Sequence, residues 1–291
     1  LAERVGKAGL LAMAFLAVSP YHVLFSQEAR SYALLFLEAA VVLNLLWDLR
    51  EEGQRWKWAA LAVAVASMMY THYMAAFFLV AAGVMAIVWS RGRPGFRKGA
   101  LLALAGSIAL FVPWMKTAYQ HTVLIQKGFW IPFPTAQIVG YSLSQLAVSP
   151  VPFGEPRHYA WAGAMWLLAI AAPWIAREKR LAVWLLPLLL PIAGEWLVSF
   201  SRPLFYTRTF MYVLIPLFVL VAIAIQRLPA WGRAAAAFAV FAAMVPGLIA
   251  SKANRYKEDW RGCSQLAKRA GPGEAVVIHP WFLQRNVEYY W

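Results

Sequence analysis

Residues 27–33, close to the beginning of the chain, place an acid and a guanidinium between two long apolar stretches. In this motif Gln27, Glu28, Arg30 and Tyr32 offer an amide, a carboxylate, a guanidinium and a phenol. Ionisable groups at the end of a membrane helix must pair, reach water or bind a ligand, because exposure to hydrocarbon is costly. Taken alone, the motif fits either an interfacial turn whose charges reach the lipid headgroups or part of a binding site.

Two further polar clusters end or begin apolar runs later in the chain. His72 and Tyr73 stand between two such runs, and Tyr206 and Arg208 directly precede another. Each has a structural explanation, since His72 can be a hydrogen-bonded interfacial imidazole and Arg208 a headgroup anchor. Together these groups and the first motif favour a site for an anionic, partly apolar molecule, because the planar fork of arginine suits phosphate.

Composition identifies the class of protein that must position these groups. Hydrophobic residues make up 62% of the chain and charged residues 14%, with a mean hydropathy of +0.58, which predicts an integral membrane protein. The net charge of +14 does not indicate nucleic-acid binding, because 14 of the 27 Lys and Arg lie in short segments between apolar runs. A single cysteine, Cys263, excludes an intrachain disulfide and a cysteine-based metal cluster.

Apolar runs of about 15 to 20 residues are the unit to count, since a helix that crosses about 30 Å of hydrocarbon needs about 20 residues. We therefore expect an all-α polytopic membrane protein with about nine transmembrane helices. Prolines such as Pro20 and Pro113 are expected to kink them. The nine expected spans are 8–25, 32–48, 58–71, 74–90, 100–117, 160–176, 181–199, 209–226 and 234–250.

The distribution of Lys and Arg between the spans predicts their orientation. One alternating set of connecting segments carries fourteen of these residues and the other set carries six. The positive-inside rule places the richer set in the cytoplasm, and the motif at 27–33, His72, Tyr73 and Arg208 on the outer side. The expected location is therefore the cytoplasmic (inner) membrane of the cell, with the polar groups facing outward.

Two segments outside the spans have distinct characters. The segment 118–159, which contains Lys127, Trp130 and a possible amphipathic helix from Thr135 to Val148, is predicted to be an outer lid in the membrane interface. The tail 251–291 is expected to form a separate outer domain beside the bundle 1–250. Its helix at 259–270, turn and buried strand at 275–278 read as the opening of a truncated α/β domain.

Several motifs resemble those of bacterial family-39-like glycosyltransferases, which are relatives of the protein O-mannosyltransferases and of the transferase that adds aminoarabinose to lipid A. The similarity covers essentially the whole chain. Its motifs are Ser19-Pro20 with Phe25-Ser26-Gln27-Glu28-Ala29-Arg30-Ser31-Tyr32-Ala33, then Thr71-His72-Tyr73, Phe129-Trp130-Ile131-Pro132, Ser199 through Pro203 to Arg208 with Pro216, and Asp259-Trp260-Arg261.

The resemblance implies a GT-C-type helical bundle that moves a sugar from a polyprenyl-phosphate donor to a lipid, glycan or protein acceptor on the outer face. Arg30 and Arg208 are then candidates for the donor phosphate. Glu28 is expected to bind the sugar or orient Arg30, and Gln27, Tyr32, His72 and Tyr73 to line the pocket. No metal ligands are predicted, and assistance by a divalent metal stays open.

The chain departs from the family pattern at two places. The family's catalytic carboxylate lies in a first outer loop, so the expected base lies upstream of Leu1. Thr209 follows Arg208 where the family usually has tyrosine. A membrane transporter or flippase for a lipid-linked sugar is the alternative function, and it predicts repeat symmetry and polar groups near the middle of the membrane.

The orientation can be tested with single cysteines in a variant that lacks Cys263. Cysteines at Gly53 and Gly95 should be shielded from an impermeant thiol reagent in intact cells, whereas one at Gly128 should react. Labelling at Gly53 from outside would reverse the orientation and remove the reason for a lipid-borne donor.

Overall fold

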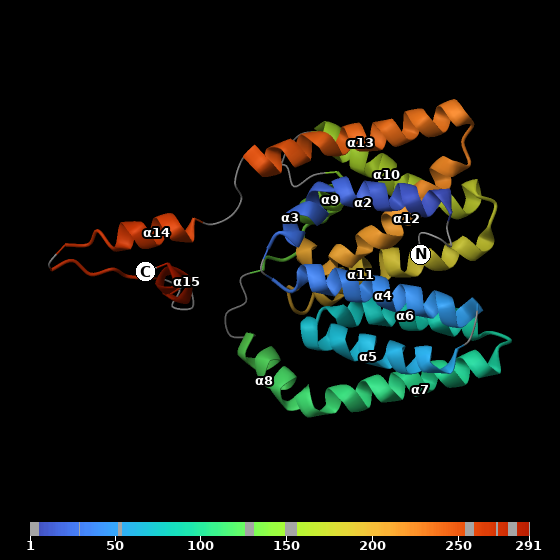
Figure 1. The fold of residues 1–291 in the computed structure, drawn as a ribbon, viewed down its shortest axis with the longest axis horizontal. Helices are drawn as coiled ribbons and strands as arrows, with labels where there is room; N and C mark the ends of the chain where they lie inside the picture. Colours follow the sequence, from blue (N-terminus) through green and yellow to red (C-terminus); the bar gives the residue numbers. More distant parts are fainter. Residues whose placement is uncertain are drawn as a thin grey trace. The chain divides into compact units, whose positions relative to one another are not determined.

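A computed structural model describes residues 6–28, 30–51, 54–125, 131–148, 156–253, 259–271, 273–278 and 284–290. All regular structure in these residues is helical (Figure 1). The chain divides into two compact units, Leu1–Ala250 and Ser251–Trp291.

The first unit contains every long apolar helix of the described residues. Its elements are α2 (Lys7–Val18), α3 (Pro20–Ser26), α4 (Tyr32–Glu51), α5 (Arg55–Thr71), α6 (Ala75–Ser90), α7 (Pro94–Phe111), η1 (Val112–Trp114), α8 (Met115–Ile125), α9 (Ala136–Ala147), α10 (Pro156–Ile175), η2 (Lys179–Trp184), α11 (Leu185–Val198), η3 (Thr207–Val213), α12 (Leu214–Gln226) and α13 (Ala230–Ala253). The elements labelled η are 3₁₀ helices.

Five helical stretches in the described part of the chain are long and apolar enough to cross a membrane, or six if the bent pair α2 and α3 forms one span. These helices indicate a membrane-embedded protein. Each of the nine predicted spans overlaps a helix, but the count of nine is not confirmed. Helices α5 and α6 have only 17 and 16 residues, so each extends about 25 Å, less than the hydrocarbon thickness.

The first predicted span is bent at Pro20. Helices α2 and α3 meet at an angle of 62°. Ser19 separates them, and its hydroxyl accepts the His22 N–H at 3.4 Å. Proline at the first position of α3 is compatible with a new helix but cannot continue the hydrogen bonding of the previous one. The predicted kink at this proline is therefore present.

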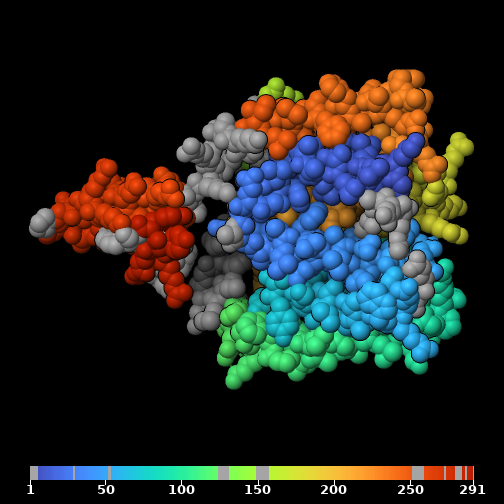
Figure 2. Space-filling model, in the orientation of Figure 1, coloured from blue at the N-terminus to red at the C-terminus, as the bar shows by residue number. Residues whose placement is uncertain are grey.

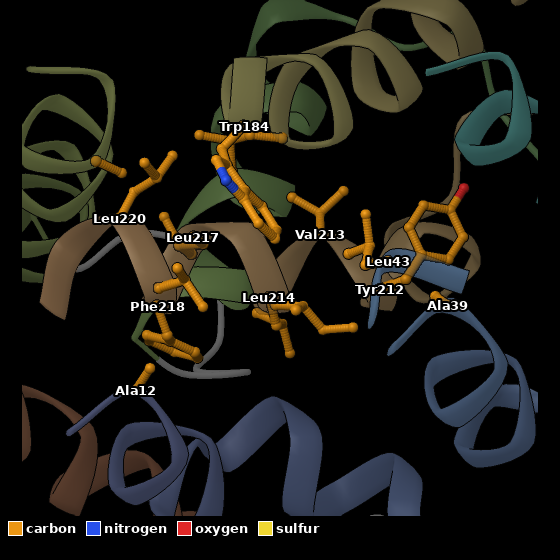
Figure 3. Close-up of a cluster of buried hydrophobic side chains, with 14 of the residues drawn as sticks. Ala12, Ala39, Leu43, Trp184, Tyr212, Val213, Leu214, Leu217, Phe218 and Leu220 are labelled. Carbon is orange, nitrogen blue, oxygen red and sulfur yellow. The ribbon is translucent and has the colours of Figure 1, made fainter. Parts of the chain in front are cut away.

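Helix α12 is the centre of the first unit. The stretch Thr207–Gln226 is 94% buried, and α12 packs against α2, α10 and α11. Phe218 points toward Ala12 of α2, while Leu217 and Val213 lie on the side of Trp184 (Figure 3). Because apolar side chains surround it on all sides, α12 carries no polar face, in keeping with its almost uniformly aliphatic sequence.

Helices α4 to α7 form a second group, in which small residues allow close packing. Helix α7 lies along α5 (Figure 1), and a Cβ built at Gly99 would lie 2.2 Å from the Trp58 indole. On the face shown in Figure 2, the cyan and green surface of α5 to α7 adjoins the blue surface of α2 to α4. Gly194 of α11 likewise admits the Phe77 ring of α6, which a Cβ there would meet at 2.7 Å.

Buried polar contacts join α4 to α5. The Lys57 ammonium donates to Asp48 at 2.7 Å, and both side chains are about nine-tenths buried. Farther along the same helices, the hydroxyls of Ser67 and Thr71 donate to the Glu38 carboxylate. Glu38 is thus an interhelical contact between α4 and α5.

The second unit does not confirm the predicted α/β domain. Its described elements are α14 (Trp260–Ala267) and α15 (Gln284–Tyr289), and the Asp259 carboxylate caps α14 by accepting the Gly262 N–H at 2.9 Å. Residues 275–278, predicted as a buried strand, are irregular, and Val277 is 86% exposed. A strand is stable only when paired, and the described residues of this unit contain no second strand.

The buried Lys57–Asp48 pair predicts that removing its cation costs more stability than removing the cation of an exposed pair. Lys57→Met leaves Asp48 buried without its cation, which typically costs about 3–5 kcal/mol of unfolding free energy. The matched control is Arg227→Met, which removes the cation of the half-exposed Arg227–Glu178 pair and should cost at most about 1 kcal/mol. Thermal unfolding in detergent measures both. Equal losses would contradict a structural role for the buried pair, and Asp48→Leu combined with Lys57→Met should recover most of the loss.

Candidate functional site

A cavity of about 980 Å³ lies at one end of the first unit, and we refer to it as the aromatic cavity. Four segments form its walls: the start of α4, the end of α5 with the following turn and the start of α6, the η1–α8 region, and the chain between α11 and α12. The lining residues are Tyr32, Tyr70, Thr71, His72, Tyr73, Met74, Phe77, Trp114, His121, Thr122, Ile131, Ser201, Arg202, Pro203, Leu204, Tyr206, Arg208 and Thr209.

His72 is held at the turn between α5 and α6. Its extended backbone ends α5, and its Nδ1 accepts the Met74 N–H at 3.2 Å. In the neutral imidazole the proton therefore lies on Nε2, which is available as a donor. Burial lowers the pKa of His72, and the nearby Arg208 charge lowers it further. A neutral imidazole at pH 7 follows from both effects.

Arg208 lies between two phenol rings. The centre of its guanidinium is 4.4 Å from the Tyr206 ring centroid and 5.3 Å from that of Tyr32. The Tyr32 ring is in turn 5.9 Å from the His72 ring. No carboxylate of a described residue forms an ion pair with Arg208, and its buried Nε has no hydrogen-bond partner there. The rings thus orient the cation and leave its donor groups for a ligand.

Hydrogen bonds to α11 hold the segment that carries Arg208. The Ser199 hydroxyl donates to the Glu195 carbonyl at 2.6 Å and accepts the N–H groups of Leu204 and Phe205 at 3.0 and 2.9 Å. The hydroxyl of Thr209 lies 2.8 Å from the fully buried Glu195 carboxylate. These bonds fix the backbone on both sides of Arg208.

A second brace comes from α9. Its Ser142 hydroxyl accepts a hydrogen bond from Thr207 at 2.8 Å. Thr135 caps this helix by accepting the Ile138 N–H, a role that threonine commonly has at a helix N-terminus. Helix α9, which belongs to the predicted lid segment 118–159, is therefore hydrogen-bonded to the segment that carries Arg208.

The wall formed by η1 and α8 is attached through Tyr73. The Trp114 indole N–H donates to the Tyr73 hydroxyl at 3.0 Å, and that hydroxyl is 3.2 Å from Nδ1 of His121. Tyr70 donates to the Leu110 carbonyl at 2.9 Å. Helix α8 bends away from the axis of α7 (Figure 1), which brings His121 to the cavity.

Four of the seven residues predicted from sequence line the aromatic cavity, namely Tyr32, His72, Tyr73 and Arg208. Gln27, Glu28 and Arg30 do not line it. Arg30 lies 3.8 Å from the Glu28 carboxylate, and its side chain is 47% exposed. The charges of Arg30 and Glu28 still act on the Tyr32 phenol, so the motif adjoins the cavity through Tyr32. Lys127 and Trp130 of the predicted lid lie outside the described residues.

Sequence reasoning missed Tyr70, Trp114 and His121 as wall residues. Trp114 and His121 are seven residues apart, which places them on one side of a helix over two turns, and this spacing was the available signal. Arg202 also lines the cavity, on the same segment as Arg208.

The lining combines two guanidiniums with imidazoles, phenols and an indole, and its described residues include no carboxylate. Such a wall attracts an anion and offers flat apolar faces beside polar tips. Within the described ranges, no group of three or more His, Cys, Asp or Glu could hold a metal ion. The arrangement suits an anionic molecule that also carries an apolar or ring-shaped part.

Comparison of the chain with family models, with curated proteins and with solved structures finds no match. The chemistry of the aromatic cavity must therefore follow from its own side chains.

The electrostatic contact between Arg208 and His72 is testable by NMR titration of labelled histidine. We expect a pKa for His72 below its ordinary value of 6.5, so the imidazole stays neutral as the pH falls through that value. Arg208→Gln should raise this pKa only partway, because burial, the larger cause, remains. His72→Gln assigns the resonance among the five histidines. Arg233→Gln, beyond the other end of α12, removes an equal charge and should leave the pKa unchanged. A His72 that titrates at 6.5 in both proteins would contradict the geometry.

Proposed function

We propose that this protein is a membrane glycosyltransferase that moves a sugar from a polyprenyl-phosphate donor to an acceptor on the extracytoplasmic face. The observation that carries the proposal is Arg208, a cation that lines a cavity at the end of membrane helices and has no carboxylate partner among the described residues. The motifs shared with family-39-like glycosyltransferases point in the same direction.

Arg208 is the proposed ligand of the donor phosphate. A guanidinium can donate two parallel hydrogen bonds to phosphate oxygens, and its charge persists at every physiological pH. The Tyr32 and Tyr206 rings, 5.3 and 4.4 Å from the guanidinium carbon, restrict its orientation before the donor arrives. Arg202, on the same segment, supplies a second cation. Arg30, which is half-exposed and next to Glu28, is assigned a weaker role outside the cavity.

The remaining walls are proposed to bind the sugar. Aromatic side chains such as Tyr73 and Trp114 present apolar faces for the C–H groups of a sugar ring and polar tips for its hydroxyls. Neutral His72 can donate from Nε2 to a sugar or phosphate oxygen, because its Nδ1 is occupied by the Met74 N–H. The sugar would then lie between the phosphate contact and the turn after α5.

The proposed reaction is an in-line displacement at the anomeric carbon. The acceptor oxygen forms a bond to that carbon while the bond from carbon to phosphate oxygen breaks, and the polyprenyl phosphate leaves with the electron pair. Arg208 stabilises the charge that develops on the leaving phosphate. A carboxylate base takes the acceptor proton.

The proposal predicts that Arg208→Lys weakens binding of polyprenyl phosphate and slows transfer. Lysine keeps the charge but loses the planar fork, and loss of an oriented stabilising donor typically slows catalysis by about 10²–10³-fold. Binding is measured by native mass spectrometry of the chain in detergent. Transfer is measured with the purified protein and a polyprenyl-phosphate sugar.

Arg227→Lys is the matched control, since Arg227 pairs with Glu178 outside the cavity and should keep wild-type binding. Arg30→Lys should have a smaller effect than Arg208→Lys. Normal transfer by Arg208→Lys would remove the phosphate role. Donor binding without any sugar transfer would instead favour a transporter or flippase.

A further inference from the structure

A second concavity lies among α4, α5, α6 and α7 and shares no lining residue with the aromatic cavity. It has a volume of about 230 Å³, and we refer to it as the apolar groove. Its walls are almost wholly aliphatic, with small residues at its centre, including Ala82, Gly83 and Ala86 of α6 and Ala100 and Ala103 of α7. Because these side chains are small, they leave open the space that forms the groove.

The groove is long and narrow. Along α6 it extends from Leu79 to Ser90, a distance of about 16 Å at the rise of an α-helix. At about 230 Å³ along this length, the groove has room for a single hydrocarbon chain and cannot enclose a whole helix.

The groove opens sideways to the surface of the helices. Three of its lining residues, Ile87, Leu101 and Leu104, are 64%, 60% and 54% exposed. Helix α7 belongs to a candidate membrane span, and the exposed residues on this side are apolar, as expected of a surface that faces lipid. A lipid chain can enter laterally without any movement of the helices.

One end of the groove carries a cation. Arg97 lines the groove together with Ser90 and is exposed, and no described carboxylate forms an ion pair with it. The Ser90 hydroxyl donates to the Ile87 carbonyl at 2.7 Å, so its oxygen faces a ligand only as an acceptor. Arg97 is thus the groove's candidate contact for a negatively charged group.

We propose that the apolar groove binds one acyl chain of an anionic phospholipid, with the headgroup phosphate at Arg97. The shape selects a hydrocarbon chain, and the guanidinium selects a negative headgroup over a zwitterionic one. Ser90 ends α6, whereas the aromatic cavity lies at the start of the same helix. The lipid site is therefore separate from the proposed transferase site and does not depend on that function.

Titration of the detergent-solubilised chain with phosphatidylglycerol or phosphatidylcholine, read by native mass spectrometry, tests the proposal. Gly83→Leu should abolish the tight phosphatidylglycerol adduct, because the added side chain points into open space: a Cβ at Gly83 meets nothing within 4 Å. Gly163→Leu on α10 is the matched control, since a Cβ there is equally free. It carries the same helical substitution outside the groove and should bind lipid like the wild type.

The headgroup contact has its own test, which does not require the groove to be filled. Arg97→Gln should weaken phosphatidylglycerol binding about fivefold, the effect of one basic residue at a lipid surface, and leave phosphatidylcholine binding unchanged. Lys98→Gln, an exposed neighbour that does not line the groove, is its control. Wild-type binding of phosphatidylglycerol by Gly83→Leu, or equal effects of Arg97→Gln and Lys98→Gln, would overturn the proposal. Since Arg97 is exposed, this second variant decides the matter even if Gly83→Leu does not fold.

Discussion

Backbone N–H and C=O groups that lie away from water must find hydrogen-bond partners within the protein. The structure at the cavity end of this bundle depends on that requirement. The chain between α11 and α12 leaves helical geometry for several residues beside the most deeply buried helix of the protein. Irregular backbone among membrane helices persists only where protein groups replace the lost hydrogen bonds. Ser199 meets that requirement on one side of the segment and Thr209, with Glu195, on the other.

The hydrogen bonds of Ser199, Thr209 and Glu195 link the core to the aromatic cavity. Glu195 is buried within α11, and its partner Thr209 directly follows Arg208. Thr209 therefore anchors the arginine segment to α11, because its hydroxyl reaches the carboxylate. The arginine is thus positioned from behind by hydrogen bonds and from the sides by aromatic rings, and a ligand need not order the segment when it binds.

The sequence predicted the features that depend on local pattern. Every long apolar run is helical, Pro20 bends the first span, and the polar residues at the ends of α5 and η3 meet in one cavity. Features that depend on the direction of a helix after a break were not predictable. His121 lies on α8, which departs from the axis of α7 (Figure 1), and no pattern in the residues specifies that angle.

The prediction of a strand at 275–278 was wrong because strand pairing cannot be judged from the run alone. An aliphatic run such as 275–278 has the composition of a strand, but a strand requires a second segment in register, which no property of the run itself reports. The count of nine spans is not confirmed for a related reason, since the apolar character of α5 and α6 does not reveal that their helices are shorter than the hydrocarbon thickness of a bilayer.

The two walls of the aromatic cavity differ in how they are anchored. The arginine wall is tied to buried groups of α9 and α11, whereas the wall formed by η1 and α8 reaches Tyr73 through two exposed side-chain bonds. Local opening draws on the segments with the fewest buried contacts. The wall formed by η1 and α8 is therefore expected to open at a lower free-energy cost than the arginine wall, so that a ligand can be exchanged without breaking the buried hydrogen bonds that position Arg208.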